Sequence, residues 1–165
     1  MLSISGELLG IVSTTQWAVA NTGFDVSGPH DSGKTQNLAA AGATWGDDPT
    51  VRRGYADTWS GTVAATMARV ARCNEGFAAF DETSTSALKG ATRAGTAVDL
   101  ATKVMMLSDG AERDRCGDAA QARPSRFVYL STGNAAIMNS LEGKQDVIDA
   151  HSMRLVALQL EHHSG

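Results

Sequence analysis

The chain has 165 residues, of which 42% are hydrophobic and 19% are charged, and its formal net charge is −4. This length suits one hydrophobic core, and the acidic balance argues against a stand-alone DNA-binding protein. No apolar run reaches the roughly 18 residues of a membrane-spanning helix, and the cysteines lack a C-x-x-C spacing. We therefore expect no membrane partner, no zinc site and a reducing, cytoplasmic location.

Short apolar segments alternate with segments of helical period along the chain. This alternation predicts an α/β fold with a mainly parallel sheet. We expect residues 1–22 to form a helical N-terminal segment, and residues 23–165 to form one core. The predicted strands are Gly23–Ser27, Phe77–Asp81, Phe127–Ser131 and Arg154–Leu160, with a fifth near Arg53–Trp59.

Two helices are predicted between these strands from the spacing of their apolar residues. The first has a buried stripe and ends near Asn74, and the second runs from about Thr96 to Leu107. The expected inward residues are Val63, Met67, Val70 and Ala71 in the first helix, and Val98, Ala101, Val104 and Met105 in the second. The polar residues 108–126 that follow suggest a β-hairpin or a functional loop.

The segment after the first strand fits the pattern G-x-x-x-x-G-K-[ST], with a strand before it and a helical stretch after it. Its residues are Gly28, Pro29, His30, Asp31, Ser32, Gly33, Lys34 and Thr35. In such a loop the backbone amides and the positive end of the helix bind phosphate. Lys34 would reach the β- and γ-phosphates of ATP, and the Thr35 hydroxyl would ligate Mg²⁺.

A buried strand ends in two acids, Asp81 and Glu82. We expect this strand to lie beside the strand that leads into the glycine-rich loop. Asp81 would then hold Mg²⁺ and Glu82 would act as general base toward water.

Hydroxyl and amide side chains end the next predicted strand. Ser131, Thr132 or Asn134 would position the attacking water against the γ-phosphate. An ordinary turn is the alternative, because turns favour the same residue types.

Together these stretches resemble DUF927, a helicase-like ATPase family of mobile-element primase-helicases that is related to the AAA+ ATPases. The resemblance runs from about Gly23 to Leu158. It rests on GFDVSGPHDSGKT, TW at Thr58 and Trp59, FAAFDE, MLSDG at Met106 to Gly110, FVYLSTGN, and RLVAL at Arg154 to Leu158.

The resemblance implies a three-layer P-loop NTPase sandwich that forms a hexameric, DNA-translocating ring. Each ATP site would lie between two subunits, and Arg154 would complete the neighbour's site, although a solvent-exposed arginine at a strand edge is the alternative. It also implies a basic hairpin that contacts DNA weakly in the ring pore, with Arg113 and Arg115 as its candidates.

Several features depart from the family pattern. No helical lid is expected after Leu160, and Asp31 places a negative charge near the phosphates. A nucleotide-binding switch or non-hydrolysing oligomerisation module is therefore the second hypothesis, and a small-molecule P-loop kinase is the third. His151, His162 and His163 are expected to lie in a solvated tail.

Overall fold

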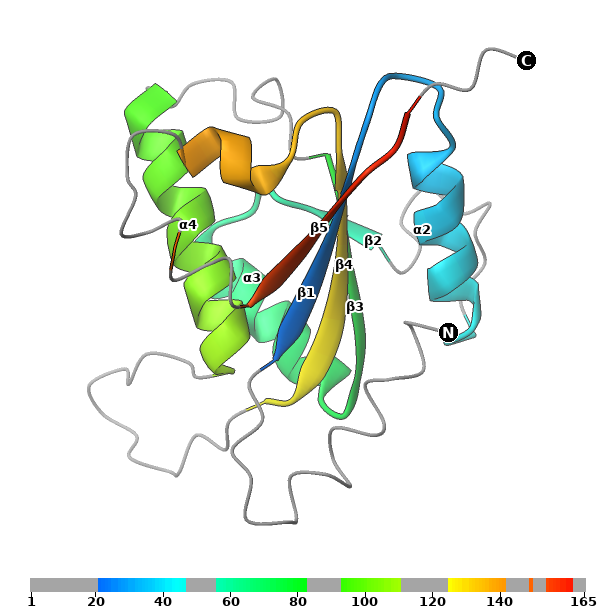
Figure 1. The fold of residues 1–165 in the computed structure, drawn as a ribbon. Coiled ribbons are helices and arrows are strands. Elements are labelled where there is room, and N and C mark those ends of the chain that lie inside the picture. The colour runs from blue at the N-terminus through cyan, green and yellow to red at the C-terminus, as the bar shows by residue number, and fades with distance from the viewer. Residues whose placement is uncertain are drawn as a thin grey trace, which may run out of the picture.

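The computed structural model describes residues 21–46, 56–82, 93–110, 125–141, 149 and 154–161, and for residues 93–99 and 140–141 it describes the backbone alone. Five parallel strands form one sheet in the order β2-β3-β4-β1-β5 (Figure 1). The strands are β1 (Thr22–Ser27), β2 (Ala56–Thr58), β3 (Gly76–Asp81), β4 (Phe127–Gly133) and β5 (Leu155–Gln159).

The predicted mixed α/β fold with a parallel sheet is confirmed. All five strands occur where the sequence predicts them, with ends that differ by a few residues. The expected neighbourhood of β1 and β3 is wrong, because β4 lies between them. Most of the proposed N-terminal segment, residues 1–20, lies outside the described residues.

Helices cover both faces of the sheet and make three layers (Figure 1). On one face α2 (Lys34–Ala43) packs through Leu38 onto Phe77, Ala79 and Leu130. The other face is covered by the remaining helical segments. These are α3 (Val63–Val70), the 3₁₀ turn η2 (Ala71–Cys73), α4 (Arg93–Asp109) and the 3₁₀ turn η3 (Ile137–Leu141).

The first predicted helix corresponds to α3, whose start is capped by Thr62. The Thr62 side chain accepts a hydrogen bond from Ala65 N–H at 3.2 Å, which satisfies an amide that has no partner inside the helix. Met67 and Val70 are buried as expected. Ala71 is exposed, contrary to the prediction, because the chain passes there into η2 and the α-helical period ends.

The second predicted helix, α4, is longer than expected at both ends. It passes through Gly95 and continues to Asp109, so the segment assigned to a hairpin or loop starts in helix. Gly110, with φ at 64°, ends the helix, and its N–H bonds to Met106 O at 3.0 Å.

The inward face of α4 also differs from the prediction. Leu100, Val104 and Leu107 are buried, whereas Ala101 and Met105 are only partly buried. Val98 lies among the residues whose side chains are not described. The helix is apolar on two neighbouring stripes, so its period alone does not choose the stripe that meets the sheet.

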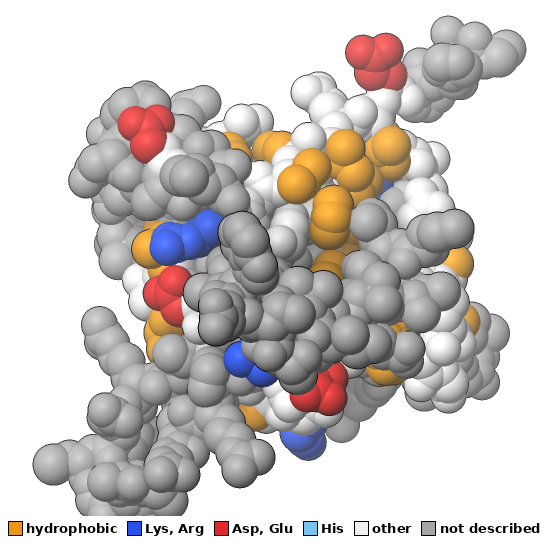
Figure 2. All heavy atoms as spheres, turned by 60° about the horizontal axis from the view of Figure 1, so that its bottom comes forward, with side chains coloured by type: hydrophobic (Ala, Val, Ile, Leu, Met, Phe, Trp, Pro, Cys, Tyr) orange, Lys and Arg blue, Asp and Glu red, His pale blue; other side chains and the backbone are white. Residues whose placement is uncertain are grey.

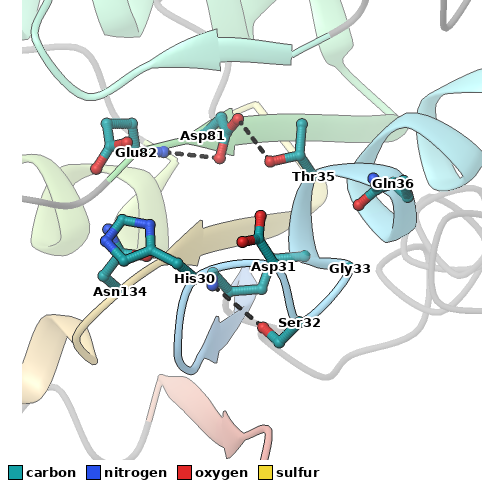
Figure 3. Close-up of a pocket in the computed structure, with 11 residues that line it drawn as sticks. His30, Asp31, Ser32, Gly33, Thr35, Gln36, Asp81, Glu82 and Asn134 are labelled. Atoms are coloured by element: carbon teal, nitrogen blue, oxygen red, sulfur yellow. Dashed lines mark hydrogen bonds between the residues drawn. The ribbon is translucent and has the colours of Figure 1, made fainter. Parts of the chain in front are cut away.

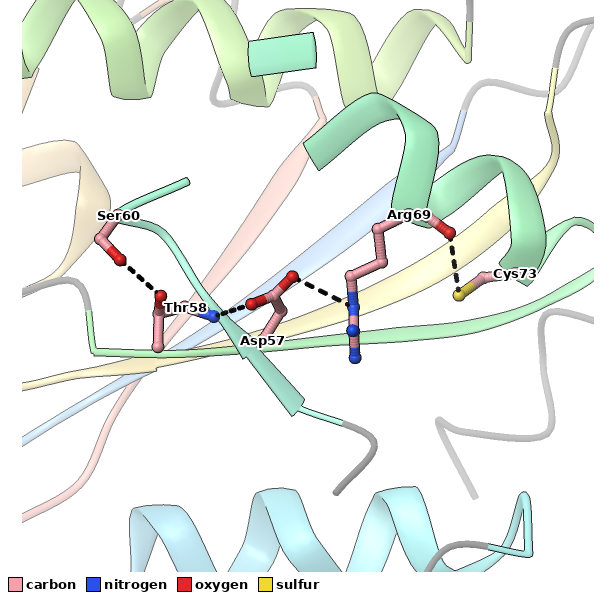
Figure 4. Close-up of polar contacts among 5 residues, drawn as sticks. All are labelled: Asp57, Thr58, Ser60, Arg69 and Cys73. Atoms are coloured by element: carbon pink, nitrogen blue, oxygen red, sulfur yellow. Dashed lines mark hydrogen bonds and ion pairs between the residues drawn. The ribbon is translucent and has the colours of Figure 1, made fainter. Parts of the chain in front are cut away.

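The strand β2 forms one edge of the sheet and is attached to α3 by a polar contact (Figure 4). The Asp57 carboxylate pairs with Arg69 Nε at 3.5 Å and accepts the Thr58 N–H at 2.8 Å. Cys73 Sγ lies 3.7 Å from the carbonyl of Arg69. The Asp57–Arg69 ion pair, together with the pairing to β3, holds this strand of only three residues in place.

The strand β5 forms the opposite edge and stays partly uncovered. Figure 2 shows hydrophobic side chains gathered on one face of the molecule, and the large exposed ones among the described residues are Val156 and Leu158 of β5. None of the helices in the described ranges is long and apolar enough to cross a membrane.

Candidate functional site

The carboxyl ends of parallel strands lie together at one edge of the sheet, and the residues predicted to bind ATP and Mg²⁺ gather there. From β1 the chain passes to α2 on one face, and from β4 it passes to η3 on the other face (Figure 1). The two connections diverge where β1 and β4 are neighbours. Such a switch point leaves a crevice at the carboxyl ends of the strands, where α/β proteins bind ligands.

The Gly28–Thr35 loop leads from β1 into the start of α2. Gly33 has φ at 79° and caps the helix without a side-chain hydrogen bond. The first intrahelical bond of α2 runs from Asn37 N–H to Gly33 O at 3.0 Å, so the preceding amides of the first turn have no intrahelical acceptor. These amides, together with the helix dipole, favour an anion at this position.

Gly28 is required by close approach of the chain on its other side. A Cβ atom at Gly28 would lie 2.9 Å from the carbonyl oxygen of Leu160, which follows β5. Two backbone bonds fix this crossing, from Gly28 N–H to Gly133 O at 3.2 Å and from Leu160 N–H to Ser27 O at 2.7 Å. The loop is therefore held between the ends of β4 and β5.

The Lys34 ammonium lies within the curve of the loop. It donates to Gly28 O at 3.0 Å, to Pro29 O, and to Ser32 Oγ at 3.2 Å. The Ser32 hydroxyl in turn donates to Pro29 O at 2.9 Å. The loop thus presents one positive charge beside the amides of α2.

The Asp81 carboxylate joins three segments of the site (Figure 3). Its Oδ2 accepts from the Thr35 hydroxyl at 3.4 Å, and its Oδ1 accepts from Glu82 N–H at 2.9 Å. The same Oδ1 also accepts from the Thr132 hydroxyl at 2.5 Å. The contacts with Thr35 and Thr132 cross from β3 to α2 and to β4. Although β3 and β1 are not neighbours, Asp81 and Thr35 lie together.

A pocket of about 230 Å³ opens over this cluster. Its lining is polar and comes from the loop, the start of α2 and the ends of β3 and β4. The lining residues are His30, Asp31, Ser32, Gly33, Lys34, Thr35, Gln36, Asp81, Glu82, Gly133 and Asn134. Pockets for whole drug-sized ligands span roughly 300–1,000 Å³, so this one matches the phosphate end of a nucleotide better than the entire molecule.

The three candidates at the end of β4 face different surroundings. Ser131 is buried and its Oγ accepts from Trp59 Nε1 at 3.0 Å on the α3 and α4 side of the sheet. Thr132 is buried and bonded to Asp81, and Asn134 is exposed and lines the pocket. Asn134 is therefore the one of the three that a bound molecule would meet.

No protein-family model matches the chain, and no curated protein matches it by sequence. The fold resembles a solved structure. That structure is described as "SCCmec type IV Cch - active helicase", with a TM-score of 0.69 and 16% sequence identity. The match covers 99% of this chain and 28% of the helicase chain, and at this identity it shows the fold alone. The resemblance to DUF927 stays a prediction.

Arg154 precedes β5 and lies at the amino edge of the sheet, opposite the pocket. Its Nη2 pairs with Asp109 Oδ1 at 3.6 Å, and its Nη1 lies 3.1 Å from Met105 Sδ. A strand rises about 3.3 Å per residue, so the five residues of β5 separate Arg154 from the carboxyl edge by about 16 Å. Arg113, Arg115 and the three histidines assigned to the tail lie outside the described residues.

Asp25, in β1, is a buried polar residue that the sequence analysis did not single out. Its Oδ2 accepts from Ile137 N–H at 2.7 Å. Burial raises the pKa of Asp25 from its ordinary value of 3.8 to about 6, and the hydrogen bonds from Ile137 N–H and the Ser131 side chain partly oppose that shift. An acid at an inward position of a predicted strand was the available signal.

Proposed function

We propose that this chain is the ATP-binding and ATP-hydrolysing core of a helicase-like DNA motor. The observation that carries the proposal is the Asp81 carboxylate, which accepts hydrogen bonds from the hydroxyl groups of Thr35 and Thr132 beside the Gly28–Thr35 loop. The loop, with its sequence pattern and its place between β1 and α2, is then a P-loop. In this proposal the five-stranded parallel sheet is that of an AAA+-like P-loop NTPase, as the resemblance implies.

In this proposal the loop binds the phosphates of ATP. Gly33, Lys34, Thr35 and Gln36 line the pocket, and the amides of the first turn of α2 and the Lys34 ammonium would supply the positive charge that phosphates need. Lys34 exchanges its contacts with Gly28 O and Pro29 O for phosphate oxygens, since all are oxygen acceptors for the same ammonium group.

Thr35 and Asp81 would hold Mg²⁺, and their oxygen donors suit it. Mg²⁺ prefers hard oxygen ligands and is often bound by one or two carboxylates together with substrate phosphates. Among the described residues no group of three or more His, Cys, Asp or Glu side chains could hold a metal ion. The ion would therefore bind together with the nucleotide, where it neutralises phosphate charge.

Glu82 and Asn134 are the proposed groups for hydrolysis, and both line the pocket. Glu82 would accept a proton from water as the water oxygen attacks the γ-phosphorus and the bond between this phosphorus and ADP breaks. Asn134 would orient that water, since its amide can both donate and accept hydrogen bonds. Thr132 would act through Asp81, whose carboxylate it fixes.

The helicase part of the proposal draws on the similarity to the SCCmec type IV Cch helicase. This chain corresponds to 28% of that protein's length, so DNA contacts through Arg113 and Arg115 and assembly into a homo-oligomeric ring, a hexamer by resemblance, are proposals about the whole protein. Arg154 pairs with Asp109 at the end of the sheet opposite its own pocket, and in this proposal it would act in the neighbour's site.

The test is ATP turnover with and without single-stranded DNA. Stimulation by DNA at saturating ATP supports the motor. Turnover that ignores DNA leaves an ATPase and removes the helicase function, whereas absence of both binding and turnover removes the proposal entirely. A mixture of Arg154→Ala and Glu82→Gln proteins, each inactive alone, should regain activity if Arg154 completes a neighbouring site.

A nucleotide-binding switch with little or no hydrolysis is the second candidate, and Asp31 favours it. Asp31 lines the pocket, and in Figure 3 its carboxylate points from the loop toward the side where Asp81 lies. A negative charge at this position opposes phosphate binding. If Asp31→Asn tightens ATP binding but neither protein turns ATP over, the switch is the better account.

A further inference from the structure

The turn after β4, residues 133–137, is attached to the glycine-rich loop at its start and to β1 at its end. At its start Gly133 O accepts the N–H of Gly28, at 3.2 Å. At its end Ile137 N–H donates to Asp25 Oδ2, at 2.7 Å. Asn134, which lines the pocket, lies inside this turn. The turn that carries Asn134 is therefore tied to the phosphate-binding loop through Gly28 and to β1 through Asp25.

The second of these bonds is made by a side chain in the interior. Asp25 is fully buried, and so is the side chain of Ile137, which belongs to the core between the sheet and α4. Asp25 lies opposite Ser131 in the pairing of β1 with β4, and Ser131 Oγ accepts from Trp59 Nε1. The carboxylate thus sits where β4, the turn and the core meet.

A buried N–H without an acceptor is costly, so the position of Ile137 is tied to the presence of Asp25. If the acceptor is lost, the Ile137 amide must find another partner, and the turn has to shift to reach one. Gly133 is still held by Gly28 N–H, so the shift falls on the residues between, including Asn134. The pairing of β1 with β4, from Thr22 opposite Val128 to Ser27 opposite Gly133, is made by the backbone and does not need the Asp25 side chain.

We propose that Asp25 is a positioning residue of the ATPase site, which fixes the 133–137 turn against β1 and thereby places Asn134 at the pocket. The inference rests on the proposed function. Asp25 does not line the pocket and touches no bound molecule in this proposal; it acts through Asn134. Its loss should therefore lower the rate of hydrolysis more than the affinity for ATP.

The first experiment compares Asp25→Asn with Asp25→Leu. Asparagine keeps an oxygen acceptor for Ile137 N–H, and leucine keeps nearly the same shape without one. We expect Asp25→Leu to lower kcat by about tenfold or more with the Kd for ATP within about threefold of the parent, and Asp25→Asn to keep kcat within about threefold. Parent-like turnover in Asp25→Leu, or an equal loss in both variants, would overturn the proposal.

The second experiment measures hydrogen exchange of the Ile137 amide and does not depend on turnover. The parent and Asp25→Asn should protect this amide, and Asp25→Leu should exchange it at least about tenfold faster. An Ile137 amide that exchanges in the parent as fast as in an unfolded chain overturns the proposal, whether or not Asp25→Leu folds. A protected amide in a protein without ATPase activity would show that the proposed function, rather than the contact, has failed.

Discussion

The polar side chains at the carboxyl ends of the strands (the carboxyl edge) and at their amino ends (the amino edge) have opposite roles. At the carboxyl edge the hydroxyl groups of Thr35 and Thr132 both donate to the Asp81 carboxylate, and Thr35 and Asp81 line an open pocket. At the amino edge Asn21 is buried and spends its hydrogen bonds on the backbone. Its Nδ2 donates to the carbonyls of Leu107 and Ser125, each at 2.8 Å, and its Oδ1 accepts from Phe127 N–H at 3.0 Å.

The two ends of the strands therefore have different roles: side chains at the carboxyl end are available to a ligand, and Asn21 at the amino end stabilises the fold. The Asn21 side chain is buried and bonded only to backbone groups, so it stabilises the fold and offers nothing to a ligand. Groups whose partners are other side chains, as at Asp81, can exchange these partners for a metal ion or phosphate. Substitutions at Asp81 and its neighbours should therefore change function with little effect on stability, and substitution of Asn21 should do the reverse.

The largest expected effect comes from Glu82→Gln. Glutamine keeps the shape of the side chain and loses the basic oxygen, and a general base contributes about 10²–10⁴ in rate. We expect kcat for ATP hydrolysis to fall by about that factor while ATP and Mg²⁺ stay bound. Parent-like turnover would mean that water is activated elsewhere. Asp81→Asn is the matched comparison, and it should lower the apparent affinity for Mg²⁺ instead.

Lys34→Ala should abolish tight ATP binding. Bonds to a charged donor are worth about 1.5–3 kcal/mol each, so loss of the ammonium is expected to weaken ATP binding by about 100-fold or more. Titration with a fluorescent ATP analogue measures this, and the thermal unfolding midpoint should stay near that of the parent. Wild-type affinity in Lys34→Ala would contradict the phosphate-binding role of the loop.

The buried Asp25 makes stability depend on pH. Burial raises its pKa to about 6, so the folded state favours the protonated form. The stability that Asp25 contributes in its protonated form at low pH is lost as pH rises from about 4 to about 6. The shift corresponds to about 3 kcal/mol at neutral pH. Two other titratable groups lie on the same side of the sheet as Asp25. Burial also raises the pKa of Tyr129, and the Lys103 ammonium donates to Trp59 O at 2.8 Å.

Asp25→Asn removes this titration. The variant should be more stable than the parent at pH 7, by up to about 3 kcal/mol, and nearly equal to it at pH 4. Urea unfolding at several pH values between 4 and 7 gives the comparison. A constant difference between the two proteins across this range would show that Asp25 does not titrate as a buried acid.

Asn21→Ala tests the amino edge and should have the smallest total effect. It leaves Phe127 N–H and two carbonyls without their side-chain partner, which we expect to cost about 2 kcal/mol of unfolding free energy. The Kd for ATP should stay within about twofold of the parent, because Asn21 is at the far edge from the pocket. An ATP-binding defect larger than the loss of stability would erase the distinction between the two edges.

The sequence by itself determined the order of the elements and the chemistry of the glycine-rich loop. Alternation of apolar strands with helical segments is a local property, so all five strands and the positions of α3 and α4 followed from it. The loop pattern with its flanking strand and helix predicted which residues would face the pocket, and His30 to Thr35 all line it. Asp81 and Glu82 were also predicted from the sequence, because an apolar strand that ends in two acids can be recognised from the order of residues alone.

Only the tertiary structure decided which elements meet. Strand order arises from packing between distant segments, so the sequence did not reveal that β4 separates β1 from β3. The inward stripe of α4 depended on the sheet that it covers. Asp25 and Ile137 are 112 residues apart in sequence, and their hydrogen bond exists because β4 pairs with β1 and returns the turn over the strand.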